Sequence, residues 1–548
     1  MKTANRFFIV IFFLFLMGTA MAACAPIIDN TNGSENTGDP LEPQDPQDPE
    51  DPQDPKEPED PINPNPPGEG APGTGVNIVK NALTLTIGAK GKLEYSIASD
   101  VTDKSVTWTT SNPSIITVDK YGIITAKGIS TGGGTAFISG AATGTAVLTV
   151  KSNSDSTKND TITITTTTAG LEDIMTLPPL KDQFKDYFMI GNIFNPGDVP
   201  ASTVNNSNLT RHFNVLTHEN NMKPYALTSG RDSTTGEITY TFDTADNMIN
   251  AAITSGFFVH GHTLLWHSQN AGWMNNKTDG TGMGADKETV LAVMKKYVTD
   301  VAAHFKGRLH SWDVLNEVFP DGVSASAGWK TSMRDNNPWY KAIGSDFVYE
   351  GFLAARLADP DAILYYNDYN TDQTGKATMI RNMVHDVNQE YKNNLAAIKA
   401  ENPDVNLNRT ELLIEGIGMQ EHHNTDVLVT NIKNTLNLFK PLGVIIAVSE
   451  LDVLGQGYNA FENAGGQGTN KHNQSTVTNN GIINQAAKYN EYMKLYIEFK
   501  DIIERVSLWG VTDNNSWRSI SLPLLFDHNG KAKPSYYSFI SALPPPQE

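Results

Sequence analysis

The sequence predicts an α/β protein with two folded parts: a (β/α)8 barrel over residues 171–545, and a small all-β sandwich over residues 76–169. Three observations support this prediction. From Leu171 onward, eight mostly apolar runs alternate with longer amphipathic segments, and near-continuous apolar runs are typical of parallel strands covered on both faces. Residues 77–168 instead carry short β-branched runs separated by turn residues. The 548 residues also exceed one ordinary domain.

Residues 1–23 have the pattern of a signal peptide. Lys2 and Arg6 precede an apolar run over 7–17, which is short for a permanent membrane span, and small residues follow it. The single cysteine of the chain, Cys24, comes directly after "MAA", and "MAAC" resembles the lipobox of bacterial lipoproteins although Met21 is less usual there than leucine. A chance cysteine is the alternative to lipidation of Cys24. We therefore expect an exported, cell-surface or outer-membrane lipoprotein of a bacterium, attached to the membrane at Cys24.

Residues 24–75 are the predicted lipidated N-terminus and linker. Proline recurs about every third residue, which favours an extended polyproline II conformation, and few apolar residues are available to form a core. Ten acids and one lysine between Asp39 and Asp60 contribute −9 to the net charge of −20. The acidity thus belongs mainly to the linker, and the negative balance argues against a nucleic-acid partner. No obligate protein partner is predicted.

The sandwich is predicted from "LTLTIG", "SVTWTT", "IITV", "GIITAKG", "TAFISG" and "TAVLTV", with no helical periodicity between them. The stretch "VTWTTSNPSIITVDKYGIITAKG" is similar to the bacterial immunoglobulin-like (group 2) repeat. Because the segment shows no aromatic triplet or polar cleft, we interpret this domain as a spacer. A glycan-binding module is the alternative.

The barrel strands are predicted, in order, at residues 188–193, 213–220, 257–264, 310–317, 362–368, 411–420, 444–453 and 506–513. Amphipathic segments between them predict the helices. One example spans residues 286–307, where Val290, Val293 and Tyr297 recur at helical spacing. Asp286 is its predicted N-terminal cap and Gly307 its end. Eight strands alternating with helices predict a barrel of the TIM type.

Most of these runs end in amides, acids, histidines or tryptophans, among them Glu317, Glu450 and Asp513. The carboxyl ends of barrel strands share one face, where such barrels carry their active sites. Glu317 ends the fourth run and Glu450 lies near the end of the seventh, so we expect the two carboxylates to face each other. Such a pair can cleave a glycosidic bond, one acting as proton donor and the other ionised. Tryptophans nearby would suit flat sugar faces.

The sequence resembles family 10 glycoside hydrolases, the endo-β-1,4-xylanases, over nearly all of residues 175–543. The resemblance rests on "HFNVLTHENNMKP", "GHTLLWHSQ", "WDVLNEVF", "LYYNDYNT", "GIGMQEHH", "VSELDV" and "LWGVTDNNSW", which occur in the family's order. It implies that the substrates are xylan and xylo-oligosaccharides, cleaved with retention at the anomeric carbon. Residues 456–483 depart from the family pattern as an enlarged loop, and His260 stands where arginine is usual.

The resemblance also implies roles for individual residues. Glu317 would be the acid/base and Glu450 the nucleophile, with His422 and Asp452 orienting Glu450. Asn316 would bind the sugar 2-hydroxyl. The remaining implied residues divide into a glycone-binding group, a group completing the centre, and two stacking tryptophans: Glu219, Asn220, Lys223, His262, Trp266 and Gln269; Gln420, Asn367 and Tyr369; Trp509 and Trp517.

Several alternatives remain open from the residues alone. The pairs His260/His262 and His422/His423 could suggest a metal site, but they lack the spacing of metal ligands, so we expect no metal and no cofactor. Trp509 and Trp517 could be core residues. The barrel could be a β-1,4-glucanase, or an inactive glycan-binding lipoprotein. A serine hydrolase is not indicated, since no G-x-S-x-G motif occurs.

Overall fold

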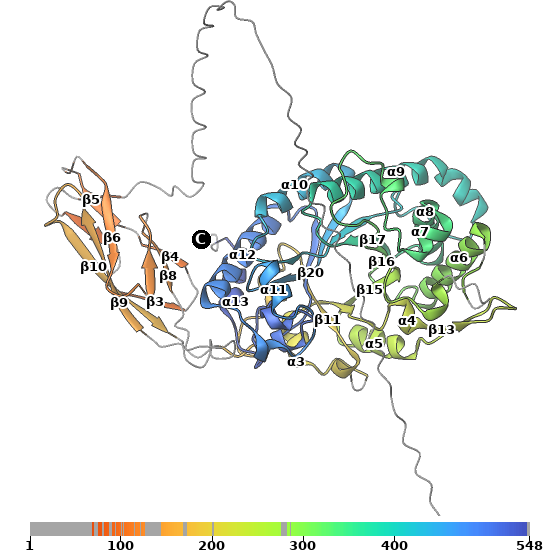
Figure 1. Cartoon of the computed structure of the whole chain (residues 1–548), viewed down its shortest axis with the longest axis horizontal. Coiled ribbons are helices and arrows are strands. Elements are labelled where there is room, and N and C mark those ends of the chain that lie inside the picture. The colour runs from red at the N-terminus through yellow and green to blue at the C-terminus, as the bar shows by residue number, and fades with distance from the viewer. Residues whose placement is uncertain are drawn as a thin grey trace, which may run out of the picture. The chain divides into compact units, whose positions relative to one another are not determined.

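The structure is a computed structural model (Figure 1). The structure describes residues 172–544 except 200–201, 276–281 and 285, and residues 68–167 except 71–74, 79–81, 87–89, 94, 100, 102, 114, 121 and 127–143. The predicted signal peptide, Cys24 and most of the linker lie outside the described residues. No helix in the described ranges is long and apolar enough to cross a membrane.

The larger part is the predicted (β/α)8 barrel. Its eight parallel strands pair in chain order, and pairing of β11 with β21 and of β18 with β20 completes the circle. Each strand is followed by a helix on the outside of the barrel (Figure 1). The strands are β11 (Met189–Phe194), β12 (Val215–His218), β15 (Phe258–Leu265), β16 (Ser311–Asn316), β17 (Ile363–Asp368), β18 (Gly416–Met419), β20 (Ile445–Val453) and β21 (Ile503–Leu508).

The helices that follow these strands bury one apolar face against the barrel, and together they form one hydrophobic core. In the helix predicted at 286–307, the Asp286 carboxylate accepts a hydrogen bond from Thr289 N (2.8 Å), which satisfies a free amide of the first turn. In strand order the helices are α3 (Ser207–His212), α5 (Asp243–Thr254), α6 (Lys287–His304), α8 (Asp346–Ala358), α9 (Thr374–Glu401), α10 (Val429–Phe439), α12 (Asn479–Glu498) and α13 (Pro534–Ile540).

Two predicted strands have wrong boundaries. The sixth was predicted from residue 411, but residues 411–415 form an irregular segment whose amides at Leu413 and Ile414 donate to the side chain of Asn388. The eighth was predicted at 506–513, but it spans Ile503–Leu508. Glu504 and Arg505 lie near its start, where Arg505 pairs with Glu504 and Glu504 contacts His310. These charged residues interrupt the apolar run, so the sequence pattern did not indicate a strand there.

The enlarged loop predicted at 456–483 is shorter than expected, because α12 begins at Asn479. The rest contains a short helix, α11 (Tyr458–Asn463), and has a small apolar cluster of its own made by Leu454, Phe461 and Ile520. Its backbone is bound to the segment that follows β21, for example through Gly468 N and Trp517 O (2.6 Å). The loop is therefore an ordered segment with its own apolar contacts and hydrogen bonds to the region after β21.

The N-terminal part is all-β, as predicted. Its strands form small sheets in the orders β3-β10-β9-β6, β1-β5-β2 and β4-β8-β7, and Trp108, Ile97 and Leu148 lie in a core of their own. Strand β1 (Gly68–Gly70) falls within the predicted linker, and the run "TAFISG" lies outside the described residues. The remaining strands are β2 (Val76–Ile78), β3 (Ala82–Thr86), β4 (Lys90–Lys92), β5 (Tyr95–Ala98), β6 (Val106–Thr110), β7 (Ile116–Val118), β8 (Ile123–Ala126), β9 (Gly144–Ser152) and β10 (Asn159–Thr167).

Candidate active site

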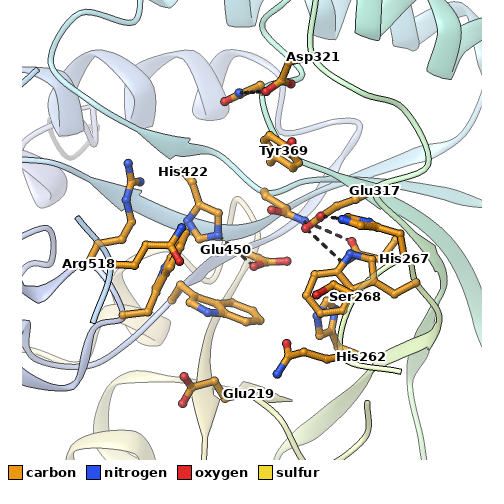
Figure 2. Close-up of a pocket in the computed structure, with 18 of the residues that line it drawn as sticks. Glu219, His262, His267, Ser268, Glu317, Asp321, Tyr369, His422, Glu450 and Arg518 are labelled. Atoms are coloured by element: carbon orange, nitrogen blue, oxygen red, sulfur yellow. Dashed lines mark hydrogen bonds and ion pairs between the residues drawn. The ribbon is translucent and has the colours of Figure 1, made fainter. Parts of the chain in front are cut away.

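The carboxyl ends of the barrel strands bring the predicted site residues together. Six of them are the first residue after a strand, so the parallel arrangement alone places them at one mouth of the barrel. They line a cleft of about 880 Å³, part of which is shown in Figure 2. These six residues are Glu219, Trp266, Glu317, Tyr369, Gln420 and Trp509.

Glu450 lies within β20 and is 5% exposed. Its Oε1 accepts a hydrogen bond from Asn367 Nδ2 (2.8 Å), and its Oε2 lies 3.1 Å from His422 Nε2. Asn367 is itself fixed, because Ser449 Oγ donates to its Oδ1 (2.6 Å). Gly418 leaves room for the Asn367 side chain, since a Cβ at that position would collide with it. Glu450 is thus held in one orientation by two donors.

His422 supplies a positive charge to Glu450. Burial by itself would lower the pKa of His422, but the carboxylates of Asp452 and Glu450 outweigh it and raise the pKa to about 9. Asp452 Oδ2 lies 2.9 Å from His422 Nδ1, while its Oδ1 accepts from Arg518 (2.5 Å). A protonated imidazole donates its Nε2 hydrogen to Glu450 Oε2 and places a positive charge beside this carboxylate.

Replacing His422 by asparagine is expected to remove a pH-dependent part of the stability. The folded pKa of about 9 lies above the ordinary value of 6.5, so folding takes up a proton. The stabilisation, of order 3 kcal/mol, is complete below pH 6.5 and is lost as the pH rises through 9. The thermal midpoint of the wild type should fall across this range more steeply than that of His422→Asn. The exposed His385, changed to asparagine, is the control; equal slopes in all three proteins would contradict the assignment.

The groups in direct contact with the Glu317 carboxylate are neutral instead. Its Oε1 accepts from Gln420 Nε2 (3.0 Å) and, at 3.4 Å, from Asn316 Nδ2, and its Oε2 lies 3.8 Å from His267 Nδ1. Burial and the charge of Arg334 lower the pKa of His267 to about 4, so this imidazole is uncharged near neutral pH. The contrast with Glu450, which faces a cation, gives the two carboxylates different electrostatic environments.

The backbone at Glu317 is strained. Its φ is +55°, a left-handed conformation that a non-glycine residue adopts at a cost. Arg334 Nε donates to the Glu317 carbonyl oxygen (2.9 Å), and Glu317 N donates to Asn367 O (2.9 Å). These bonds hold the strained turn, which directs the carboxylate into the cleft as Figure 2 shows.

A chain of amides connects the two carboxylates. Asn367 Nδ2, which bonds Glu450, also donates to Asn316 Oδ1 (3.0 Å), and Gln420 Nε2 donates to the same oxygen (3.2 Å) as well as to Glu317. Each carboxylate therefore shares a donor with Asn316. The arrangement fixes the positions of the pair relative to each other.

One end of the cleft carries polar groups suited to sugar hydroxyls. Lys223 Nζ donates to Asn220 Oδ1 (3.0 Å) and Gln269 Oε1 (2.8 Å), and Asn195 Nδ2 donates to Glu219 (2.6 Å). His262 also lines this end, and its Nδ1 is 2.8 Å from Asp313.

Aromatic rings close the walls of the cleft. Trp509 packs edge-on against His262, with ring centroids 5.6 Å apart, and Trp517 Nε1 donates to Asp452 (3.2 Å). Both tryptophans line the cleft and are not simply core residues. Tyr369 accepts a hydrogen bond from Arg334 (2.5 Å) and lies beneath Lys376 Nζ at 3.7 Å.

The structure brings together every predicted site residue of the barrel. Asp452 and Asn367 lie behind the cleft surface and contact the lining residues, whereas the other fourteen line it directly. The run-ending Asp513 does not belong to the site: it is buried in a short helical turn and pairs with Lys533 (2.9 Å). The fourteen are Glu219, Asn220, Lys223, His262, Trp266, Gln269, Asn316, Glu317, Tyr369, Gln420, His422, Glu450, Trp509 and Trp517.

Three residues near the carboxylates were given no role from the sequence: His267, Arg334 and Arg518. The sequence did carry a signal for His267, since this residue lies inside the family motif "GHTLLWHSQ". Arg334 and Arg518 lie in irregular segments after β16 and β21, where spacing carries no signal. In the part of the chain that the structure describes, no group of three or more His, Cys, Asp or Glu residues is arranged to hold a metal. His423, for example, bonds Glu421 (2.8 Å).

The carboxylates of Glu317 and Glu450 are fixed by hydrogen bonds at the mouth of a (β/α)8 barrel, in a cleft lined by amides and tryptophans. This arrangement defines a glycoside hydrolase. The chain belongs to glycosyl hydrolase family 10, whose sequence model matches residues 179–542.

Among its relatives, endo-1,4-beta-xylanase A of Thermotoga maritima is 31% identical over 385 residues, which are 67% of this chain and 31% of that protein. The endo-1,4-beta-xylanase of Geobacillus stearothermophilus is 30% identical over 375 residues, covering 67% of this chain and 98% of that one. A crystal structure of a bacterial Ig-like domain-containing GH10 xylanase from termite gut is 53% identical, with a TM-score of 0.67 over 84% of this chain and 98% of that one. The chain thus spans less than a third of the Thermotoga protein's length.

Proposed function

We propose that the protein is an endo-β-1,4-xylanase that hydrolyses internal bonds of xylan and xylo-oligosaccharides with retention of configuration. The observation that carries this proposal is the unequal environment of the two carboxylates: Glu450 beside the cationic His422, and Glu317 beside the neutral Gln420, Asn316 and His267. The names of the family relatives support xylan as the substrate.

In the proposed first step, Glu450 attacks the anomeric carbon while Glu317 donates its proton to the departing glycosidic oxygen. The carbon–oxygen bond to the leaving sugar breaks and an ester bond to Glu450 forms. In the second step Glu317, now a carboxylate, takes a proton from water as the water oxygen attacks the same carbon and releases Glu450. The two displacements together restore the starting configuration. Asn316 is proposed to bind the 2-hydroxyl of the sugar at the cleaved bond.

Release of reducing ends from three polysaccharides tests the substrate. We expect the full chain to act on xylan far better than on carboxymethyl cellulose or mixed-linkage β-glucan, because the named family relatives are endo-1,4-beta-xylanases. Chain length should fall early in the reaction because cleavage is internal. Preferred cleavage of either glucan would instead make the protein a β-1,4-glucanase, and no release from any of the three would support an inactive glycan-binding lipoprotein.

We further infer that the protein is an exported bacterial lipoprotein in which residues 24–75 and an immunoglobulin-like domain at 76–169 separate the barrel from a lipid on Cys24. The signal-peptide pattern, the "MAAC" junction and the Ig-like domain named for the termite-gut relative support this inference. A second acyl chain is expected, because one chain binds membranes only marginally.

The Cys24→Ala variant is expected to leave the membrane fraction, since the only thiol available for lipidation is lost. Fractionation of cells that express the wild type, the variant and residues 171–548 alone measures this. The short form should be soluble and retain the full chain's activity on soluble xylan, because the residues that line the cleft all lie in the barrel. A variant that stays with membranes would refute the anchor. Activity lost on insoluble xylan alone would make the N-terminal domain a binding module.

A further inference from the structure

Tyr225 is an exposed aromatic residue beside the cleft, and it has no part in the proposed catalytic steps. Tyr225 is 46% exposed, and it does not belong to the residues that line the cleft. It lies in α4 (Pro224–Leu227), the short helix that directly follows Lys223. Single exposed aromatic residues are common on protein surfaces, so its position decides whether it has a role.

Tyr225 lies at the end of the cleft formed by Glu219 and Gln269. Its backbone N–H donates to the Gln269 carbonyl oxygen (3.2 Å). Partial burial, together with the nearby negative charge of Glu219, raises the pKa of the Tyr225 hydroxyl. In Figure 2, Glu219 and Asp321 lie on opposite sides of the two catalytic carboxylates. Tyr225 therefore lies next to the cleft, on its Glu219 side.

The segment that carries Tyr225 is rigid. Pro224 fixes the first turn of α4, and the backbone N–H groups of Ala226 and Leu227 both donate to the Lys223 carbonyl oxygen (2.9 and 3.2 Å). Lys223 is 6% exposed and is tied to Asn220 and Gln269. A tyrosine on a fixed backbone loses little conformational entropy when it binds a ligand, because only its two side-chain torsions are free.

We propose that Tyr225 is a sugar-stacking platform for one more xylose unit, beyond the units held by Glu219 and Gln269 on the non-reducing side of the cleaved bond. This inference rests on the proposed xylanase function. The C–H face of a xylopyranose is flat and apolar and suits an aromatic ring, while the ring hydroxyls can reach the solvent. The residue would then set the preferred length of the glycone.

Aryl β-xylosides of increasing length test the platform in the full chain. The aryl group occupies the leaving position, so on this proposal a xylobioside would end at Glu219 and Gln269, whereas a xylotrioside would reach Tyr225. We expect the wild type to have a higher kcat/KM on the trioside. The Tyr225→Ala variant should lower the trioside-to-bioside ratio of kcat/KM by on the order of threefold to tenfold, and Tyr225→Trp should preserve it.

The matched control is Phe258→Ala. Phe258 is 51% exposed but begins β15, at the opposite end of the barrel from the cleft, and packs against His310. The Phe258→Ala variant should keep the trioside-to-bioside ratio of kcat/KM at the wild-type value. A wild-type ratio near one, or an unchanged ratio in Tyr225→Ala, would overturn the platform even though both xylosides are hydrolysed. If the wild type hydrolysed neither xyloside, the proposed function itself would fail.

Discussion

Replacing Glu450 by alanine is expected to lower kcat on every xylan substrate by roughly 10⁵-fold, because the group that forms the covalent bond is lost. The loss should not depend on the leaving group, since no other side chain in the cleft lies where Asn367 and His422 hold this carboxylate. Initial rates on xylan and on a dinitrophenyl xylobioside measure it.

Two controls separate chemistry from folding in this experiment. Glu450→Gln keeps the size of the side chain and should be about as inactive as the alanine variant. The exposed Glu491, changed to glutamine, should retain wild-type rates. Unfolding midpoints establish that all variants are folded. A folded Glu450→Ala protein with more than about 1% of wild-type kcat would contradict a nucleophilic role.

Replacing Glu317 by alanine is expected to give a different pattern. Loss of proton transfer should reduce turnover of xylan by about 10²–10⁴-fold. The dinitrophenolate of a dinitrophenyl xylobioside departs without being protonated. The first step on this substrate should therefore be nearly normal, and the glycosyl-enzyme should accumulate. Azide needs no general base, and adding it should restore turnover and yield a β-configured glycosyl azide.

The outcome that contradicts this role for Glu317 is an equal loss on both substrates with no effect of azide. Gln420→Ala is the informative comparison, because the Gln420 side chain donates to Glu317 and Asn316 and is assigned no proton transfer. The Gln420→Ala variant should lose activity on both substrates to a similar extent, and azide should not restore that activity. Leaving-group dependence and rescue therefore separate the acid/base from the side chains that position it.

The barrel could be predicted because its strands are buried on both faces and read as apolar runs. The prediction failed where charged groups are buried in pairs or where an apolar run is not a strand. Glu504 and Arg505 follow the first residue of β21, but they form an ion pair with each other, and Glu504 also accepts a hydrogen bond from Tyr365 and lies 2.7 Å from His310. Residues 411–415 are apolar at their centre, yet Glu415 ends them in an ion pair with Arg356 and Arg409.

The positions of the two carboxylates followed from strand order, whereas their electrostatic environments did not. The cation beside Glu450 depends on Asp452 and Glu450 acting together on His422, which needs three-dimensional distances. Arg334 reaches Glu317 from a segment 17 residues further along the chain. Tyr225 has no periodic or motif signal, and its exposure and its bond to Gln269 are visible only in the fold.

Mass spectrometry of the Glu317→Ala protein during turnover of the dinitrophenyl xylobioside tests the central claim most directly. The intact protein should gain one xylobiosyl group, and peptide mapping should locate that group on Glu450. Added azide should remove it. A label on any other residue, or no label while dinitrophenol is released in a rapid first phase, would contradict the assignment of Glu450 as nucleophile and Glu317 as acid/base.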